Sequence, residues 1–158
     1  MPIDPRTRIG HVHLTVSDLD RAVAFYRDVL GFEVTSRYGR DAVFLSAGGY
    51  HHHLGLNTWA GRGAPQPPRG TTGLYHFAIL YPDRPTLARA VRQVLDHGVP
   101  LEGAADHGVS EAVYLRDSDG NGVELYRDRP QSEWPRAPDG SLAMQTLALD
   151  LNALLLEA

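Results

Sequence analysis

The chain has 158 residues with a hydrophobic content of 42%, which is enough for one compact domain with a buried core. Its formal net charge of −4 and the absence of any Lys/Arg cluster argue against a nucleic-acid partner. No apolar run approaches the roughly 18–20 residues of a membrane span, and no export signal is visible, so we expect a cytoplasmic protein without membrane contact. With no cysteine and eight histidines, any metal must be held by imidazole nitrogens and carboxylate oxygens.

Residues 9–58 alternate between strand and helix patterns. IGHVHLTV is predicted as a buried strand, with His11 and His13 on one face. SDLDRAVAFYRDVLG predicts a helix that begins after Ser17 or Asp18 and ends at a left-handed Gly31. FEVTSRYG, DAVFLSAG and YHHHLGLNTW predict three short strands.

The same order returns after residues 59–73, whose Gly- and Pro-rich composition predicts a linker. Residues 74–129 read as the strand LYHFAILY, a helix opened by Asp83, and three further strands. Residues 130–158 predict an extended arm and a short terminal helix, packed on the chain's own domain or on a dimer partner. The whole chain, 1–158, is therefore predicted to be one α+β domain built from two β-α-β-β-β modules.

The repeat brings three candidate metal ligands into view. His11 and His76 stand at equivalent positions near the start of the two modules. Glu124 lies in the otherwise apolar strand GVELY, where a carboxylate is costly unless it is paired or coordinated. Two histidines and one carboxylate form a ligand set typical of non-haem Fe(II) enzymes, and the same set suits Mn(II), Ni(II) or Zn(II).

The triplet in YHHHLGLN, residues 50–57, is a second histidine-rich feature. Its position inside the chain argues against an expression tag. Because it falls in a predicted strand, alternation should prevent His51, His52 and His53 from facing the same side.

GHVHLTVSDLDRAVAFYRDVLGFEV resembles the opening module of the vicinal oxygen chelate superfamily, which includes glyoxalase I and extradiol dioxygenases. The likeness extends over residues 9–129. It implies that the paired modules form a curled mixed sheet around a metal cleft. It also implies that His11, His76 and Glu124 are the metal ligands.

A more specific likeness is to type I extradiol, catechol 2,3-dioxygenase-like enzymes. Their signature resembles ADHGVSEAVYLRDSDGNGVE, although Ala105 and Ser118 depart from the residues usual there. The matched polar and turn positions are His107, Tyr114, Asp117, Gly120 and Glu124. The resemblance implies an Fe(II) enzyme that opens the ring of a catechol with O2. His107 and Tyr114 would hydrogen-bond a substrate oxygen and help to remove its proton.

The same branch carries a histidine in a pattern matched by HHLGL, which selects His52 as the acid–base group beside the oxygen site. A competing register aligns YHHHLGL with GVELY. It places His53 opposite Glu124, where glyoxalase I supplies a fourth metal ligand. His13, two residues from a predicted ligand, is expected to support the ligands or line the pocket.

Other functions stay open, because function depends on the site rather than on the fold. A glyoxalase-type isomerase, a thiol transferase and a non-catalytic small-molecule binding protein are the alternatives. Most extradiol enzymes of this branch carry four modules, whereas this chain has two. A homodimer partner or the C-terminal tail is therefore expected to complete the pocket.

Overall fold

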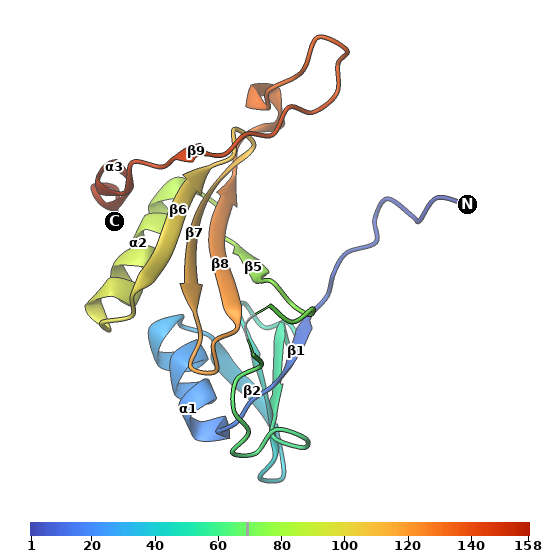
Figure 1. The fold of residues 1–158 in the computed structure, drawn as a ribbon, viewed down its shortest axis with the longest axis vertical. Coiled ribbons are helices and arrows are strands. Elements are labelled where there is room, and N and C mark those ends of the chain that lie inside the picture. Colours follow the sequence, from blue (N-terminus) through green and yellow to red (C-terminus); the bar gives the residue numbers. More distant parts are fainter. Residues whose placement is uncertain (69) are drawn as a thin grey trace. The chain divides into compact units, whose positions relative to one another are not determined.

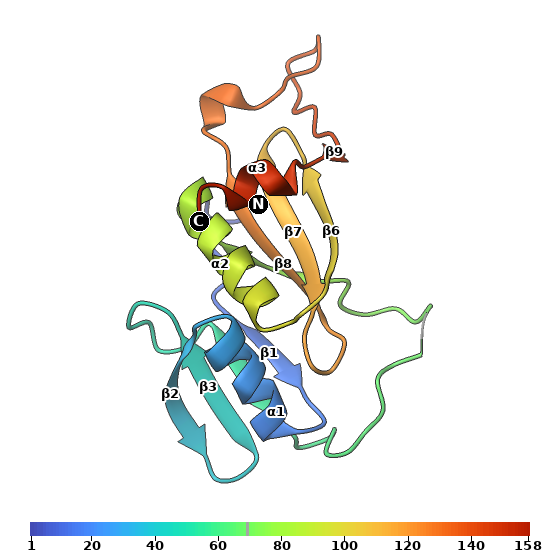
Figure 2. The ribbon, with the colours of Figure 1, turned by 90° about the vertical axis from the view of Figure 1, so that its left-hand side faces the viewer.

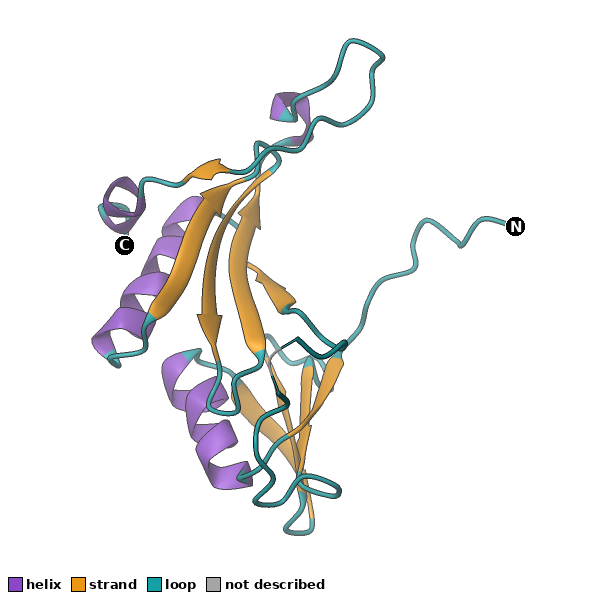
Figure 3. Cartoon of the chain, viewed as in Figure 1, coloured by secondary structure: helices purple, strands orange, loops and turns teal. Residues whose placement is uncertain are grey.

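The structure is a computed structural model that describes residues 1–68 and 70–158. The chain divides into two compact units, Met1–Gln66 and Pro67–Ala158. In each unit the packed helices lie on one face of a sheet (Figures 1 and 3). The boundary falls inside the predicted linker 59–73, of which Arg69 lies outside the described residues. The α+β class, with two curled mixed sheets, is confirmed.

The first unit contains a four-stranded sheet in the order β1-β4-β3-β2, with β1 parallel to β4 and the other pairs antiparallel. Its elements are β1 (Val12–Thr15), α1 (Leu19–Ala24), η1 (Phe25–Val29), β2 (Glu33–Tyr38), β3 (Ala42–Ser46) and β4 (Leu54–Asn57).

The helix of this unit starts and stops where its sequence predicts. The Asp18 side chain accepts a hydrogen bond from the Arg21 N–H, and Gly31 adopts a φ of 82° beyond the last turn. The predicted single helix differs in one respect, because its second half widens into π-helical turns. Both Phe25 and Tyr26 are buried there, with their rings 5.1 Å apart, so that two consecutive aromatic side chains fill the core.

The second unit contains a five-stranded sheet in the order β5-β8-β7-β6-β9, with α2 running across one face (Figure 2). Its elements are β5 (Phe77–Leu80), α2 (Arg84–Asp96), β6 (Leu101–Asp106), β7 (Ser110–Arg116), β8 (Gly122–Asp128), the 3-10 turn η2 (Gln131–Glu133), β9 (Leu147–Ala148) and α3 (Leu151–Leu155). Asp83 caps α2 by accepting from the Thr86 N–H, as the sequence predicts. The inner face of α2 buries four apolar side chains completely: Leu87, Ala88, Val91 and Val94.

Three predicted strands are shorter in the structure: IGHVHLTV forms a strand only from Val12, LYHFAILY only from Phe77, and the strand predicted over 50–59 starts latest of all. Strand β4 begins only at Leu54, and residues 51–53 form bends before it. The backbone N–H of His53 bonds to the Leu45 carbonyl, but His51 and His52 stay outside the ladder. Strand alternation therefore does not decide which way the three imidazoles point.

The C-terminal segment forms the predicted arm and the short helix α3, capped by Asp150. Leu154 of α3 is fully buried, and the helix packs against α2. The arm also forms strand β9, which the sequence did not predict; it pairs with the edge of β6 through Ala105–Ala148 and Asp106–Leu147. Across the described ranges, no helix is long and apolar enough to cross a membrane.

Candidate functional site

A pocket of about 320 Å³ lies in the second unit, on the sheet formed by β6, β7 and β8. It is lined by residues from the segment before β5, from strands β6, β7 and β8, from the turn after β6 and from the C-terminal arm. Those that carry polar groups include Tyr75, His76, His107, Tyr114, Arg116 and Thr146. Three residues selected from the sequence, His76, His107 and Tyr114, thus line one cavity.

His76 and Glu124 are in direct contact beside this pocket. His76 immediately precedes β5. Glu124 lies in β8, the parallel neighbour of β5, and pairs there with Ala78. The distance from His76 Nε2 to Glu124 Oε2 is 2.8 Å. Glu124 is only 8% exposed, so its carboxylate is held away from water and needs a polar partner or a cation.

The turn before β8 allows β8 to lie close to the segment before β5, which brings Glu124 to His76. Asp117 accepts hydrogen bonds from the N–H groups of Asp119 and Asn121, which closes the turn. Gly122 follows it, and a Cβ built there would lie 2.2 Å from the Tyr75 carbonyl oxygen and 2.9 Å from His76 Cβ. A glycine is required at 122 because the backbone before β5 occupies the space of a side chain.

Tyr114 extends the contact from Glu124 to His107. The Tyr114 hydroxyl lies 3.4 Å from Glu124 Oε1 and 2.7 Å from His107 Nε2. Burial, followed by the nearby Glu124 carboxylate, raises the pKa of Tyr114 to about 12. The phenol therefore keeps its proton at neutral pH and is a hydrogen-bond donor in this series.

The first unit holds a separate group of histidine rings around the position of His11. The His52 ring lies 4.5 Å from that of His11 and 5.0 Å from Phe44, measured between centroids. Its Nδ1 is 2.7 Å from the Nδ1 of His51. Burial, and then the neighbouring His11 and His51 rings, lower the pKa of His52. His52 is therefore a neutral imidazole next to His11, the predicted ligand.

The registers of the two parallel strand pairs identify equivalent positions in the two sheets. Val12 pairs with Leu54 as Phe77 pairs with Val123, so Gly55 is the counterpart of Glu124.

This register does not support the alternative alignment that placed His53 opposite Glu124. His53 precedes the strand, and its Nδ1 lies 3.0 Å from Ser46 Oγ. Instead, the His13 ring covers Gly55, because a Cβ on Gly55 would lie 2.9 Å from His13 Cγ. His13 also lies next to Phe44 and Trp59, with ring centroids 5.9 and 5.7 Å away.

The donor atoms suit a divalent metal bound by nitrogen and oxygen, since an imidazole nitrogen and a buried carboxylate lie side by side. Within residues 1–68 and 70–158, no three His, Asp or Glu side chains are grouped closely enough to hold a metal ion. His11 belongs to the first unit, and His76 and Glu124 belong to the second. The three-residue site that combines them stays a prediction.

Sequence reasoning missed the contribution of the C-terminal arm to the pocket. Thr146 lines it, and the Gln145 carbonyl oxygen lies 2.8 Å from His107 Nδ1. A backbone carbonyl carries no sequence signal, so no motif could have indicated this contact. The requirement for Gly122 had a signal in the DGNG turn, but its reason is visible only in the structure.

A mixed sheet with one main helix occurs twice in the chain, and a histidine precedes the first strand of each copy. This repeat defines a paired-module α+β fold. The Glyoxalase/Bleomycin resistance protein/Dioxygenase superfamily model matches residues 8–125. The chain belongs to this superfamily.

Individual relatives and similar structures include dioxygenases and a lyase. The chain is 45% identical over 152 residues to a catechol-2,3-dioxygenase of Bacillus subtilis, covering 96% of this chain and 52% of that protein. It is 35% identical to biphenyl-2,3-diol 1,2-dioxygenase 3 of Rhodococcus globerulus, covering 81% of this chain and 66% of the relative. Among solved structures, a lactoylglutathione lyase from Agrobacterium tumefaciens matches with a TM-score of 0.60 and 30% identity, covering 78% of this chain and 96% of that one. The chain thus spans about half the length of the Bacillus relative.

Proposed function

We propose that this protein is an extradiol dioxygenase that opens the ring of a catechol-type substrate with O2, using Fe(II) held by His11, His76 and Glu124. The observation that carries the proposal is the continuous series His107–Tyr114–Glu124–His76 beside one pocket. It joins two groups able to handle a hydroxyl proton to two groups able to hold a metal. The similarity to two proteins named as dioxygenases of catechol and of a biphenyl diol supports the same function.

The predicted donor set admits more than one divalent metal. Imidazole nitrogen with carboxylate oxygen suits Fe(II) and Mn(II), and Ni(II) or Zn(II) would also bind such donors. When bound, a redox-active divalent ion supplies Lewis-acid and redox chemistry for the reaction of a catechol with O2. Because Glu124 is shielded from solvent, water screens the attraction between its carboxylate and a bound cation only weakly.

The protein's own groups have separable roles. Tyr114 and His107 hydrogen-bond a hydroxyl of the catechol, orient the ring and hold the proton that the hydroxyl loses. Apolar atoms of Ala105, Leu115 and Val123 in the pocket lining suit the face of an aromatic ring. His52, a neutral imidazole against the ring of His11, donates or accepts a proton on the side of O2.

A glyoxalase-type isomerase is the second candidate, because a lactoylglutathione lyase is among the similar structures. Its expected fourth ligand would come from the first unit at the counterpart of Glu124. That position is Gly55, beneath the His13 ring, and offers no carboxylate. This difference favours the dioxygenase. We also propose that the protein is a cytoplasmic homodimer, as expected from its sequence.

The test is to load the full chain with Fe(II) under nitrogen, add a panel of catechols, admit air and follow the yellow ring-opened product. We expect turnover with at least one catechol, and less with Ni(II) or Zn(II). No product with any catechol, together with conversion of a glutathione hemithioacetal, would establish the isomerase instead.

Two histidine variants refine the assignment of His52. His52→Ala should retain iron and lose turnover by about 10²-fold or more, the range for a group that transfers protons. His97→Ala is the control, because His97 ends α2 and bonds to the Gln93 carbonyl. Loss of iron from His52→Ala would mean that His52 is a ligand rather than an acid–base group.

A further inference from the structure

The C-terminal arm contacts His107 through Gln145 at both the backbone and the ring. The Gln145 N–H donates to the His107 carbonyl at 3.1 Å, and the Gln145 carbonyl oxygen lies 2.8 Å from His107 Nδ1. Thr146 Oγ1 lies 3.4 Å from the same ring nitrogen. One residue of the arm therefore fixes both the backbone and the imidazole of His107.

The contact decides where the neutral imidazole carries its hydrogen. A carbonyl oxygen only accepts hydrogen bonds, so Nδ1 must carry the hydrogen in a bond with Gln145. A neutral imidazole has one N–H, and Nε2 is then left with a free lone pair. Its partner at 2.7 Å is the Tyr114 hydroxyl, which must then donate. That hydroxyl has a single hydrogen, and the shorter contact directs it to His107 Nε2 rather than to Glu124 Oε1 at 3.4 Å. The hydrogen bonds thus run from Tyr114 through His107 to the arm.

We propose that the backbone carbonyl of Gln145 is a positioning group, which holds His107 in the Nδ1–H tautomer and leaves Nε2 as the acceptor that faces Tyr114 and the pocket. The inference rests on the proposed function for its catalytic consequence: Tyr114 can accept the proton of a catechol hydroxyl only as it passes its own proton to Nε2, which must therefore carry a lone pair. The opposite tautomer would present an N–H to Tyr114 and would leave the Gln145 carbonyl without its donor.

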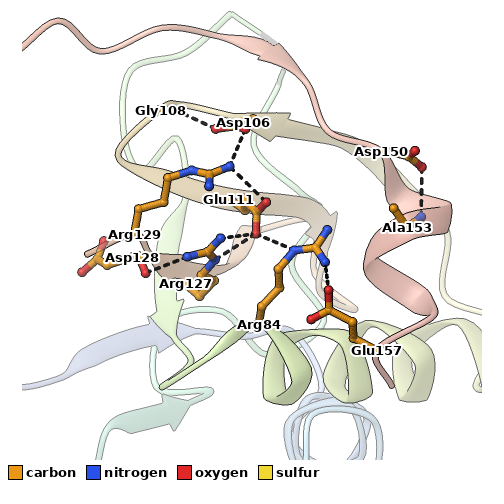
Figure 4. Close-up of polar contacts among 10 residues, drawn as sticks. All are labelled: Arg84, Asp106, Gly108, Glu111, Arg127, Asp128, Arg129, Asp150, Ala153 and Glu157. Carbon is orange, nitrogen blue, oxygen red and sulfur yellow. Dashed lines mark hydrogen bonds and ion pairs between the residues drawn. The ribbon is translucent and has the colours of Figure 1, made fainter. Parts of the chain in front are cut away.

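The turn that carries His107 is held rigidly enough for such a role. On one side, Asp106 accepts from the Gly108 N–H at 2.8 Å and from Arg129 at 2.6 Å (Figure 4). Arg129 also reaches Glu111, a buried carboxylate on β7, at 3.2 Å. The ion pairs fix the turn to the sheet, and the arm closes over its other side.

Gly108 shows how closely the arm approaches this turn. Its φ is 74°, and a Cβ there would lie 2.9 Å from Pro135 Cγ and 3.1 Å from Gln145 Nε2. A Cβ at 108 would therefore require the Pro135 ring and the Gln145 side chain to shift. Gly140, in the loop of the same arm, has a similar φ of 83° but no atom within 4 Å of a built Cβ. The two glycines therefore form a matched pair with equal backbone strain and different crowding.

The direct test is ¹⁵N NMR of the full-length, metal-free protein labelled in its histidines, at about pH 8 where imidazole is neutral. The His107 resonances are assigned as those lost in His107→Gln. We expect a protonated-type Nδ1 and an unprotonated-type Nε2. The reverse pattern, or an averaged pair of shifts, would overturn the proposal whether or not the protein turns over any catechol.

The glycine pair tests whether the arm is the cause. Gly108→Ala should average the two His107 tautomers and lower kcat on a catechol by about 10–100-fold. Gly140→Ala should change neither. An unchanged tautomer and kcat in a folded Gly108→Ala would refute the role of the arm. The expected tautomer in a protein that cleaves no catechol would instead refute the proposed function and leave the positioning contact standing.

Discussion

Gly122→Ala is the substitution for which the site geometry gives the sharpest expectation. The added methyl would lie 2.2 Å from the Tyr75 carbonyl oxygen, whereas ordinary contacts begin at 3.4 Å. The backbone before β5 must therefore move by about 1 Å, because a main-chain oxygen cannot rotate aside as a side chain can. His76 is the next residue along the chain, so it moves away from Glu124 together with Tyr75.

Two measurements follow from that displacement. Overpacking of this kind costs about 1–3 kcal/mol, which urea unfolding of the metal-free protein detects. Metal affinity should fall at least 10-fold in a titration, because a shift of about 1 Å spoils the placement of a ligand. Gly103→Ala is the control: Gly103 also lines the pocket, but a Cβ there meets no atom within 4 Å. Equal stability and metal affinity for the two variants would refute the close-approach argument.

Three further expectations concern the groups around the site. Tyr114→Phe should lower kcat by about 10²-fold or more with little loss of metal, since it removes a hydroxyl but no predicted ligand; an unchanged kcat would contradict the role of the phenol. Glu111→Gln should destabilise the protein by about 1.5–3 kcal/mol in urea, because it removes the buried carboxylate on which Arg84, Arg127 and Arg129 converge. Glu102→Gln, at an exposed ion pair, should cost less than about 1 kcal/mol, and equal losses would argue against a special role for burial. Burial raises the pKa of Asp106, but hydrogen bonds from Gly108 and Arg129 outweigh it and lower the pKa below its usual 3.8. The ionised Asp106 carboxylate thus stabilises the fold above about pH 4, and this stabilisation should disappear as the pH falls further. If the urea midpoint of Asp106→Asn falls with acid as steeply as that of the unaltered protein, Asp106 does not contribute to this pH dependence.

The helices could be predicted from the sequence because their signals are local. Asp18 and Asp83 accept hydrogen bonds within their own first turns, and Gly31 ends the first helix by adopting a positive φ. Strand β9 could not be predicted, because two exposed residues become a strand only through pairing with the distant edge of β6. The start of β4 was misplaced for a related reason. The histidine triplet continues the predicted strand in the sequence, but pairing with β3 begins only at Leu54.

The site could be predicted wherever a side chain carries the chemistry. The sequence selected His107, Tyr114, Glu124 and His76, and these four lie in consecutive contact. It could not indicate the Gln145 carbonyl, since every residue has one. Nor could it decide whether His53 lies opposite Glu124, because that depends on the strand register, which places Gly55 there.

Oxygen consumption measured together with ring opening tests the central claim most directly. The Fe(II)-loaded protein in an oxygen electrode, given a catechol that it turns over, should consume one O2 for each ring-opened product. Glu124→Ala should lose metal and both signals together. Product formed without O2 uptake, or full turnover by Glu124→Ala, would contradict a metal-dependent extradiol dioxygenase.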